Sequence, residues 1–299
     1  MFTDYINIEI NLALYYLVDF TIAVILLSGM RYLAGVVGNV SATEELSQKD
    51  NKAFGVSLAG GIVAISIMLT GVVSGDAGYN LGNEAALVLA FGLIGIALMW
   101  VTRKLFDHIS FPRLSIHDEI MRGNMAASII DACNMIATAI IIKGAMTWVD
   151  GSVATSVLAI LVSFVAAQLI LVLATYYRAK VYARRHNGRQ LHDAIEDDNV
   201  ALALRFSAYR IGIAIAVSSA FTAIEYVPEE FATVFMLWFA FAIGLFLLLT
   251  LVAIVIRHAV LHRVNIAEEV GQQGNIAVEV IEGSIYIVVG LLLAGLVGA

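Results

Sequence analysis

Several ionisable side chains lie inside stretches of this chain that are otherwise apolar. Asp131 and Glu282 occupy matching places, because each follows an asparagine by seven residues, Asn124 and Asn275 respectively. At 1.5 Å per residue, each carboxylate lies about 10 Å into a helix that begins at the asparagine. An ionisable group at such a depth in a membrane is costly unless it is paired or hydrated, so these residues mark a candidate functional site.

Further polar residues are predicted to lie near these two carboxylates. Glu279 precedes Glu282 by about one helical turn, and Asn134 follows Asp131 by about one turn, so each pair shares a helix face. Three more ionisable residues in other apolar segments complete the candidate site: Asp19, Arg205 and Arg210. Two interpretations remain open. Either the carboxylates and arginines form a structural network, or the same groups line a path for a solute or a proton.

The elements that position these residues form a fourfold repeat. Asparagine followed two residues later by alanine opens four long apolar segments, at spacings of 73, 75 and 76 residues: Asn51, Asn124, Asn199 and Asn275. Each is preceded by another long apolar segment, so a hairpin of two membrane helices is predicted to occur four times. The residue before the asparagine is Asp in the first and third units and Gly in the second and fourth. This alternation divides the chain into two halves, 1–150 and 151–299, with Asp19 and Gln168 at matching positions.

The composition requires lipid as the solvent for much of the chain. Hydrophobic residues make up 61% of it and charged residues only 14%, with a mean hydropathy of +0.89. The apolar runs are continuous rather than alternating, which favours helices over a barrel. The predicted fold is an all-α integral membrane bundle whose four hairpins enter in the same sense, with pseudo-twofold and looser pseudo-fourfold symmetry. Eight spans are predicted: Leu12–Met30, Phe54–Val73, Ala85–Val101, Met125–Ile142, Val153–Tyr176, Val200–Phe221, Phe231–Ile256 and Ile276–Val297.

The four repeated asparagines have two interpretations. Asparagine is among the best N-cap residues, so each is predicted to cap the even-numbered span that follows it; the alternative is a ring of four amides at a pore mouth. Small residues four and eight places later predict that these even-numbered helices pack closely as a central bundle. A short surface helix is predicted before each cap, with an acid six residues before the asparagine: Glu45, Asp118, Asp193 and Glu269.

The basic residues predict the orientation. They gather in the four longer connections, for example at Arg178–Arg189, and the other connections carry almost none. By the positive-inside rule, the longer connections face the cytoplasm and both termini face outward. The N-terminus lacks a basic n-region, so the first helix is expected to be its own insertion signal.

The paired hairpins, with Asp-Asn-x-Ala at the start of one and Gly-Asn-x-Ala at the start of the next, resemble the YjfL-like family of bacterial inner-membrane proteins of unknown function. The unit of that family is a four-helix domain, and this chain resembles two copies in tandem over nearly its whole length. The resemblance implies a location in the bacterial inner membrane. It brings no activity and no catalytic residues.

Signatures of enzymes are absent from the sequence. It has no zinc-protease helix, no phosphate-binding loop and no nucleophile elbow, so we predict that the chain is not an enzyme and uses no cofactor. His258 and His262 are four residues apart, but two ligands are too few for a metal site, and none is predicted. Nucleic-acid binding has no support.

Two functional classes remain beside an intramembrane enzyme, which is the least favoured. A channel-like or transporter-like protein would use the buried charges as its polar interior. A structural or scaffolding subunit would recruit a cytoplasmic protein partner through its longer connections. Membrane lipids are expected partners in both cases, and self-association into a homo-oligomer is compatible with either. Recurrence of buried charge at matching positions favours the first class.

Overall fold

The computed structural model describes residues 10–38, 41–73, 80–149, 153–262, 264, 269 and 275–298, and every regular element in these ranges is helical. Long helices alternate with short ones along the chain. In order, the elements are α1 (Ile10–Gly38), α2 (Ala42–Ser47), α3 (Lys52–Val73), α4 (Leu81–Leu105), the π-helical turn η2 (Phe106–Ser110), α5 (Ile116–Met121), α6 (Met125–Trp148), α7 (Val153–Arg185), α8 (Leu191–Glu196), α9 (Val200–Ala223), the 3-10 turn η3 (Pro228–Glu230), α10 (Phe231–Val260) and α12 (Ile276–Val297).

Seven helices in the described ranges are long and apolar enough to cross a membrane: α3, α4 with η2, α6, α7, α9, α10 with η3, and α12. The first predicted span, Leu12–Met30, lies within α1. The apolar part of α1 whose side chains are described, Ala13–Gly29, is shorter than the seven spans. α7 continues past the predicted end at Tyr176 to Arg185, because alanine, lysine and arginine are good helix formers outside the apolar region as well.

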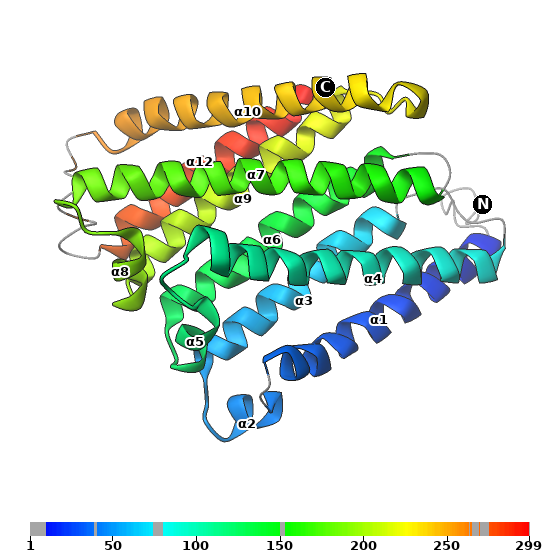
Figure 1. Cartoon of the computed structure of the whole chain (residues 1–299), viewed down its shortest axis with the longest axis horizontal. Coiled ribbons are helices and arrows are strands. Elements are labelled where there is room, and N and C mark those ends of the chain that lie inside the picture. The colour runs from blue at the N-terminus through cyan, green and yellow to red at the C-terminus, as the bar shows by residue number, and fades with distance from the viewer. Residues whose placement is uncertain are drawn as a thin grey trace, which may run out of the picture.

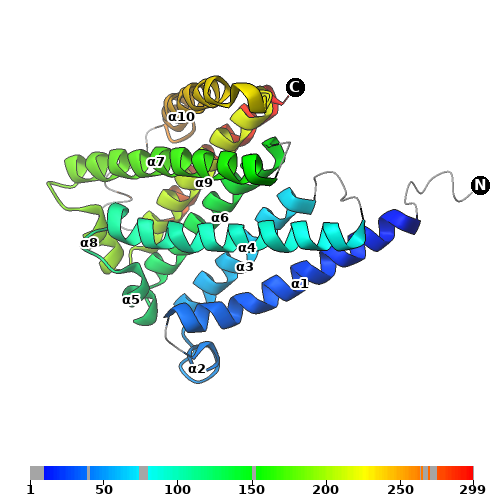
Figure 2. The same cartoon turned by 45° about the vertical axis from the view of Figure 1, so that its right-hand side comes forward.

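The long helices form two layers (Figure 1). The even-numbered spans α3, α6, α9 and α12 lie side by side as a row, with the main contacts between α3 and α6, α6 and α9, and α9 and α12. The other long helices cross this row: α4 packs on α3 and α6, α7 on α6 and α9, and α10 on α9 and α12. α1 packs on α3 and α4 at one end, as the turned view also shows (Figure 2). The predicted central bundle is therefore a row, because α3 and α12 at its two ends make no comparable contact in the described part.

Small residues permit close packing within the row. A β-carbon added to Gly60 would lie 2.3 Å from Cβ of Ala132, so α3 and α6 approach almost backbone to backbone. At the other end of the row, a β-carbon on Gly290 would lie 2.6 Å from the carbonyl oxygen of Gly212, which joins α9 to α12 in the same way. In α3 the close contact uses Gly60 in place of the predicted Ala59, which is exposed.

The short helices α2, α5 and α8 lie at one end of the molecule, which we call the loop side (Figure 1). Ser41 and Ser115 cap α2 and α5 by accepting from the amides of Glu44 and Asp118, at 3.3 and 3.2 Å. The fourth predicted short helix, near residues 265–268, lies outside the described residues. In the three units where the residue before the cap is described, it has a positive φ, of 48° at Asp50, 90° at Gly123 and 55° at Asp198. Glycine and aspartate tolerate this left-handed conformation better than most residues, which accounts for the choice between them there.

Each repeated asparagine caps the long helix that follows it. Their side-chain oxygens accept from backbone amides of the first turn: Asn51 from Phe54 at 3.0 Å, Asn124 from Ala127 at 2.8 Å, Asn199 from Leu202 at 2.9 Å and Asn275 from Ala277 at 3.1 Å. Two of the side-chain nitrogens also reach the next unit, Asn51 donating to the Ile120 carbonyl at 3.1 Å and Asn124 to the Ile195 carbonyl at 2.7 Å. These two amides tie α3 and α6 to the short helix of the following repeat, and those bonds do not fit a free ring at a pore mouth.

The acid six residues before the asparagine contacts it in two of the four units. Asn51 and Asn275 donate to Glu45 and Glu269, at 3.1 and 2.8 Å. Asn124, however, donates to Glu119 at 3.0 Å, five residues before it, and Asp118 is exposed. In the third unit the backbone amide of Asn199 donates to the carbonyl of Ala194, five residues before it, and Asp193 accepts from the backbone amide of Gln190 instead. The connection between short helix and cap differs by one residue between units, and the sequence spacing alone misses this.

Candidate functional site

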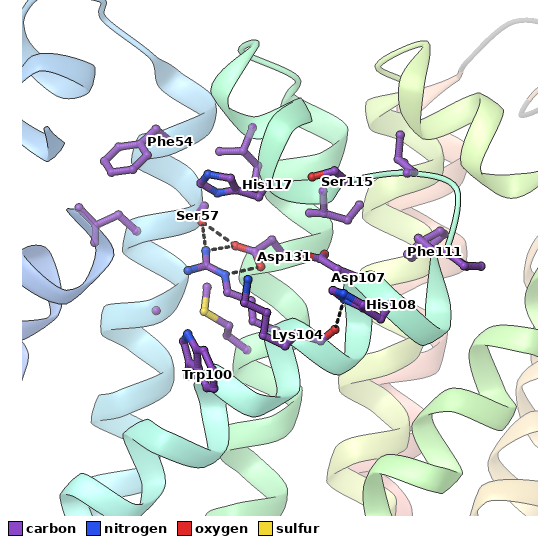
Figure 3. A pocket seen from close by; sticks show the side chains of 18 of the residues that line it. Phe54, Ser57, Trp100, Lys104, Asp107, His108, Phe111, Ser115, His117 and Asp131 are labelled. Carbon is purple, nitrogen blue, oxygen red and sulfur yellow. Dashed lines mark hydrogen bonds and ion pairs between the residues drawn. The ribbon is translucent and has the colours of Figure 1, made fainter. Parts of the chain in front are cut away.

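A pocket of about 530 Å³ lies in the first half, on the loop side (Figure 3). Its walls come from α3, α4, η2, α5 and α6 and from the segment that joins η2 to α5. The residues near its deep end include Ser57, Gly61, Arg103, Asp131 and Met135. The pocket therefore reaches the predicted depth of Asp131 from the surface formed by the short helices.

An ion pair between Arg103 and Asp131 lines the deep end. Nε of Arg103 donates to one carboxylate oxygen of Asp131 at 2.9 Å, and Nη2 donates to the other. The hydroxyl of Ser57 donates to Asp131 at 2.5 Å and accepts from Nη2 of Arg103. Asp131 is only 1% exposed, whereas the side chain of Arg103 is 30% exposed. The carboxylate of Asp131 is thus buried and paired inside the protein, whereas the partly exposed side chain of Arg103 lines the pocket.

The outer part of the pocket carries several more titratable groups. Lys104, Asp107 and His108 project from the end of α4 and from η2, while Arg113 comes from the segment that leads into α5 and His117 from α5 itself. Nδ1 of His108 donates to the carbonyl of Lys104 at 3.0 Å, which fixes the ring against its own helix. A π-helical turn widens the helix by one residue and often occurs at functional sites; here it brings Asp107 and His108 to the pocket.

The second half holds a cluster of buried charged side chains. Glu279 and Glu282 are 0% and 1% exposed. Arg205 forms ion pairs with both, at 3.1 Å each, and Nη1 of Arg257 lies 3.3 Å from the other oxygen of Glu282. Arg178 donates to the hydroxyl of Tyr286 at 3.0 Å. Three arginines and two carboxylates therefore fill this region.

The two sites correspond position by position. α3 in the first half corresponds to α9 in the second. Counting from the asparagine cap, the sixth residue is Ser57 in α3 and Arg205 in α9, and the tenth is Gly61 in α3 and Tyr209 in α9. α6 corresponds to α12 in the same way: the seventh residue is Asp131 in α6 and Glu282 in α12, and the eleventh is Met135 in α6 and Tyr286 in α12. This seventh-position acid pairs with Arg103 of α4 in the first half and with Arg257 of α10 in the second. The same ionic couple therefore occurs twice.

What differs is the filling of the space around that couple. Arg205, Tyr209 and Tyr286 stand where the first half has a serine, a glycine and a methionine. The guanidinium of Arg178 lies 4.8 Å above the ring centre of Tyr209. Arg178 follows Gln168 by ten residues, and the residue ten after Asp19 is Gly29, where an added β-carbon would meet nothing within 4 Å. In the second half, large side chains fill the region that smaller side chains leave open in the first half.

The predicted pairing of Asp131 with Arg205 or Arg210 is wrong. Arg103 occupies both oxygens of Asp131, because the end of α4 packs against α3 and α6 at that depth. Arg205 pairs with Glu279 and Glu282 in its own half, as the interpretation of a structural network predicts.

Arg210 lies elsewhere in the row, between α6, α7 and α9. It donates to Thr175 at 2.6 Å and to the carbonyl of Leu171 at 3.3 Å, and it also donates to Asn134. Its guanidinium lies 4.7 Å from the ring centre of Phe106. Within the described ranges it has no ion pair with a carboxylate. Asp19 is buried in α1, away from the residues that line the pocket.

Several residues of the pocket were not predicted as site residues. Arg103 and Lys104 follow the apolar run of α4 and, in the sequence, serve only as markers of orientation. Ser57 and Gly61 are ordinary small residues of a membrane helix. The pocket could be found from the sequence only by comparing the two halves. Ser57 corresponds to Arg205 and Gly61 to Tyr209, although both halves keep an arginine paired with the seventh-position acid.

The fold and this site define a class, a multi-pass helical membrane protein with a charged pocket in one of two related halves. A family model described as Domain of Unknown Function (DUF350) matches residues 7–146 and, a second time, residues 152–297. The chain therefore belongs to the DUF350 family and contains two tandem copies of its domain. No curated protein and no solved structure matches the chain.

Proposed function

We propose that this chain is a transporter-like protein of the bacterial inner membrane, and that its first half takes up a small solute through the pocket beside Arg103 and Asp131. In this proposal α1 is the eighth span, both termini face the periplasm and the loop side is cytoplasmic. The basic residues of the longer connections support that orientation.

One contrast carries the proposal: the same ionic couple occurs in both halves, and in the described residues a pocket lies beside the first copy while large side chains surround the second. A protein that needed the couple for packing alone would gain by filling the space around both copies, as the second half does. Leaving a cavity beside a buried ion pair costs stability, since lost contacts are not recovered. The open copy is therefore the one we assign to binding, and the filled copy to structure.

Cysteine labelling tests this assignment. In a Cys133→Ala background, which removes the only native thiol, Ser57→Cys places a thiol at the deep end of the pocket. Ala59→Cys, two residues later on α3, places a control thiol on an exposed surface of the helix that does not line the pocket. Ser41→Cys at the start of α2 reports which side of a vesicle is labelled.

A membrane-impermeant thiol reagent is applied to right-side-out and inverted vesicles. Transport by alternating access predicts that Ser57→Cys is labelled from the loop side and, more slowly, from the opposite side. Ala59→Cys lies on the outer surface of a candidate span, against lipid in this proposal, so the impermeant reagent should not label it. Labelling from the loop side alone would contradict transport and leave a binding pocket. No labelling of Ser57→Cys from either side would contradict the pocket itself and favour a scaffold.

A further inference from the structure

The charges that a ligand meets in the pocket are mainly positive. Lys104 and Arg113 are exposed, Arg103 is partly exposed, and all three line the pocket. Of the two carboxylates, Asp131 is buried and bound on both oxygens by Arg103, which leaves Asp107 as the accessible acid among the lining residues. His108 and His117 add charge when protonated. Three accessible cations thus face one accessible carboxylate.

Arg103 is held in the geometry that oxyanions require. Its inner edge, Nε and Nη2, is fixed by Asp131 and Ser57, so the guanidinium is oriented before a ligand arrives. Its third nitrogen, Nη1, donates no hydrogen bond to the described residues. A guanidinium with one free nitrogen can donate to a phosphate or carboxylate oxygen, and its preorganisation lowers the entropy lost on binding.

The second half explains why a cationic ligand does not fit. There a cation, Arg205, occupies the equivalent space and is held by Glu282 and by Glu279. Glu279 is the fourth residue after its asparagine, and the fourth residue after Asn124 is Ser128. The first half therefore lacks the second carboxylate that holds a cation in this place, while it keeps the arginine of the couple.

The walls of the pocket are suited to an adjoining apolar group. Phe54, Leu58 and Met135 line it, and the indole of Trp100 is 47% exposed beside it. Phosphate compounds from the cytoplasm and the head groups of anionic lipids share the chemistry that these residues would recognise.

We infer that the ligand of this pocket carries an anionic phosphate group, bound by Nη1 of Arg103 together with Lys104 and Arg113. This inference rests on the proposed binding role of the pocket and goes further by assigning the class of ligand. The shared chemistry is the phosphate oxygen, and the source of the phosphate is decided by the experiment.

The test is protection of Ser57→Cys from the thiol reagent, in nanodiscs and with the Cys133→Ala background. One arm adds inorganic phosphate at constant ionic strength to nanodiscs of phosphatidylcholine. The other arm omits phosphate and replaces half of the lipid by phosphatidylglycerol. Each arm is repeated with Lys104→Ser/Arg113→Ser and with the matched control Lys180→Ser/Arg184→Ser, which removes two exposed positive charges from α7 outside the pocket.

A free phosphate compound is supported if inorganic phosphate protects the thiol and the concentration needed rises about tenfold in the Lys104/Arg113 variant. In the control variant that concentration should change less than about twofold. Protection that appears with phosphatidylglycerol alone, and is lost in the same variant, supports a lipid head group. Labelling of Ser57→Cys that neither arm slows, or that both double variants alter equally, would overturn the inference while the pocket stands. If Ser57→Cys is never labelled in phosphatidylcholine nanodiscs, the proposed function itself fails.

Discussion

The ion pair beneath the pocket gives the sharpest prediction about stability. Replacing Arg103 with Gln leaves the carboxylate of Asp131 buried and supported by Ser57 alone, since two of its three hydrogen bonds come from the arginine. Removing one partner of a buried pair costs about 3–5 kcal/mol. Arg103 is 30% exposed and water can enter the pocket, so we expect a loss at or just below the lower end of that range, about 2–3 kcal/mol.

The reverse change is predicted to cost less. Asp131→Asn leaves a cation that can turn into the pocket and be hydrated, so the expected loss is about 1–2 kcal/mol. The double variant has no buried charge to strand, and its loss is expected to be smaller than the sum of the single losses by about 1–3 kcal/mol. The matched control, Lys104→Gln, changes an exposed neighbour that has no ion pair in the described part of the chain and should shift stability by less than about 0.5 kcal/mol.

Equilibrium unfolding in mixed micelles, titrated with a denaturing detergent and followed by the loss of tertiary structure, measures all four variants. The reasoning is refuted if the two single losses add within about 0.5 kcal/mol, because a direct and buried pair must couple. It is also refuted if Asp131→Asn costs more than Arg103→Gln, since the burial difference between the two partners sets that order.

Three more predictions test the pocket and the repeats. Gly61→Tyr, which copies the second half, should remove the labelling of a pocket thiol and leave the protein folded, whereas Ala59→Tyr on the exposed face should not change labelling. Asn124→Ala removes a helix cap and the bond to the next repeat, so a loss of about 2 kcal/mol in the same unfolding assay is expected, and a loss below about 0.5 kcal/mol would show that the link is unimportant. The hydrogen bond from Lys49 holds the pKa of Glu45 below its usual 4.5, so the stability it contributes is present above that pH and is lost as the pH falls through the lowered pKa; Glu45→Gln should flatten the acid side of a stability–pH profile, and an unchanged profile would contradict this.

Local patterns in the sequence predicted the repeated elements well. Continuous apolar runs gave seven helices that satisfy the criteria for spans, and the asparagine spacing located the starts of α3, α6, α9 and α12. The short helix predicted before each cap is present as α2, α5 and α8 in the first three units. These features depend on residues within one or two turns of each other, so they can be predicted without knowledge of the tertiary structure.

The partners of the buried charges could not be predicted in the same way. Arg103 reaches Asp131 because α4 crosses the row at one angle and ends at one depth, and neither quantity is encoded in a short pattern. The pocket was missed for a related reason. It is made by side chains that are small, such as Ser57 and Gly61, and a missing side chain stands out only when a related half shows what fills the same place.

A high-resolution electron cryomicroscopy map of the protein in lipid nanodiscs tests the central claim most directly. The account predicts density for water or a bound ligand within hydrogen-bonding distance of Nη1 of Arg103 in the first half. In the second half it predicts continuous side-chain density for Arg205, Tyr209 and Tyr286 and no such feature. A map in which apolar side chains close over Arg103, or in which the second half contains the larger hydrated cavity, would contradict it.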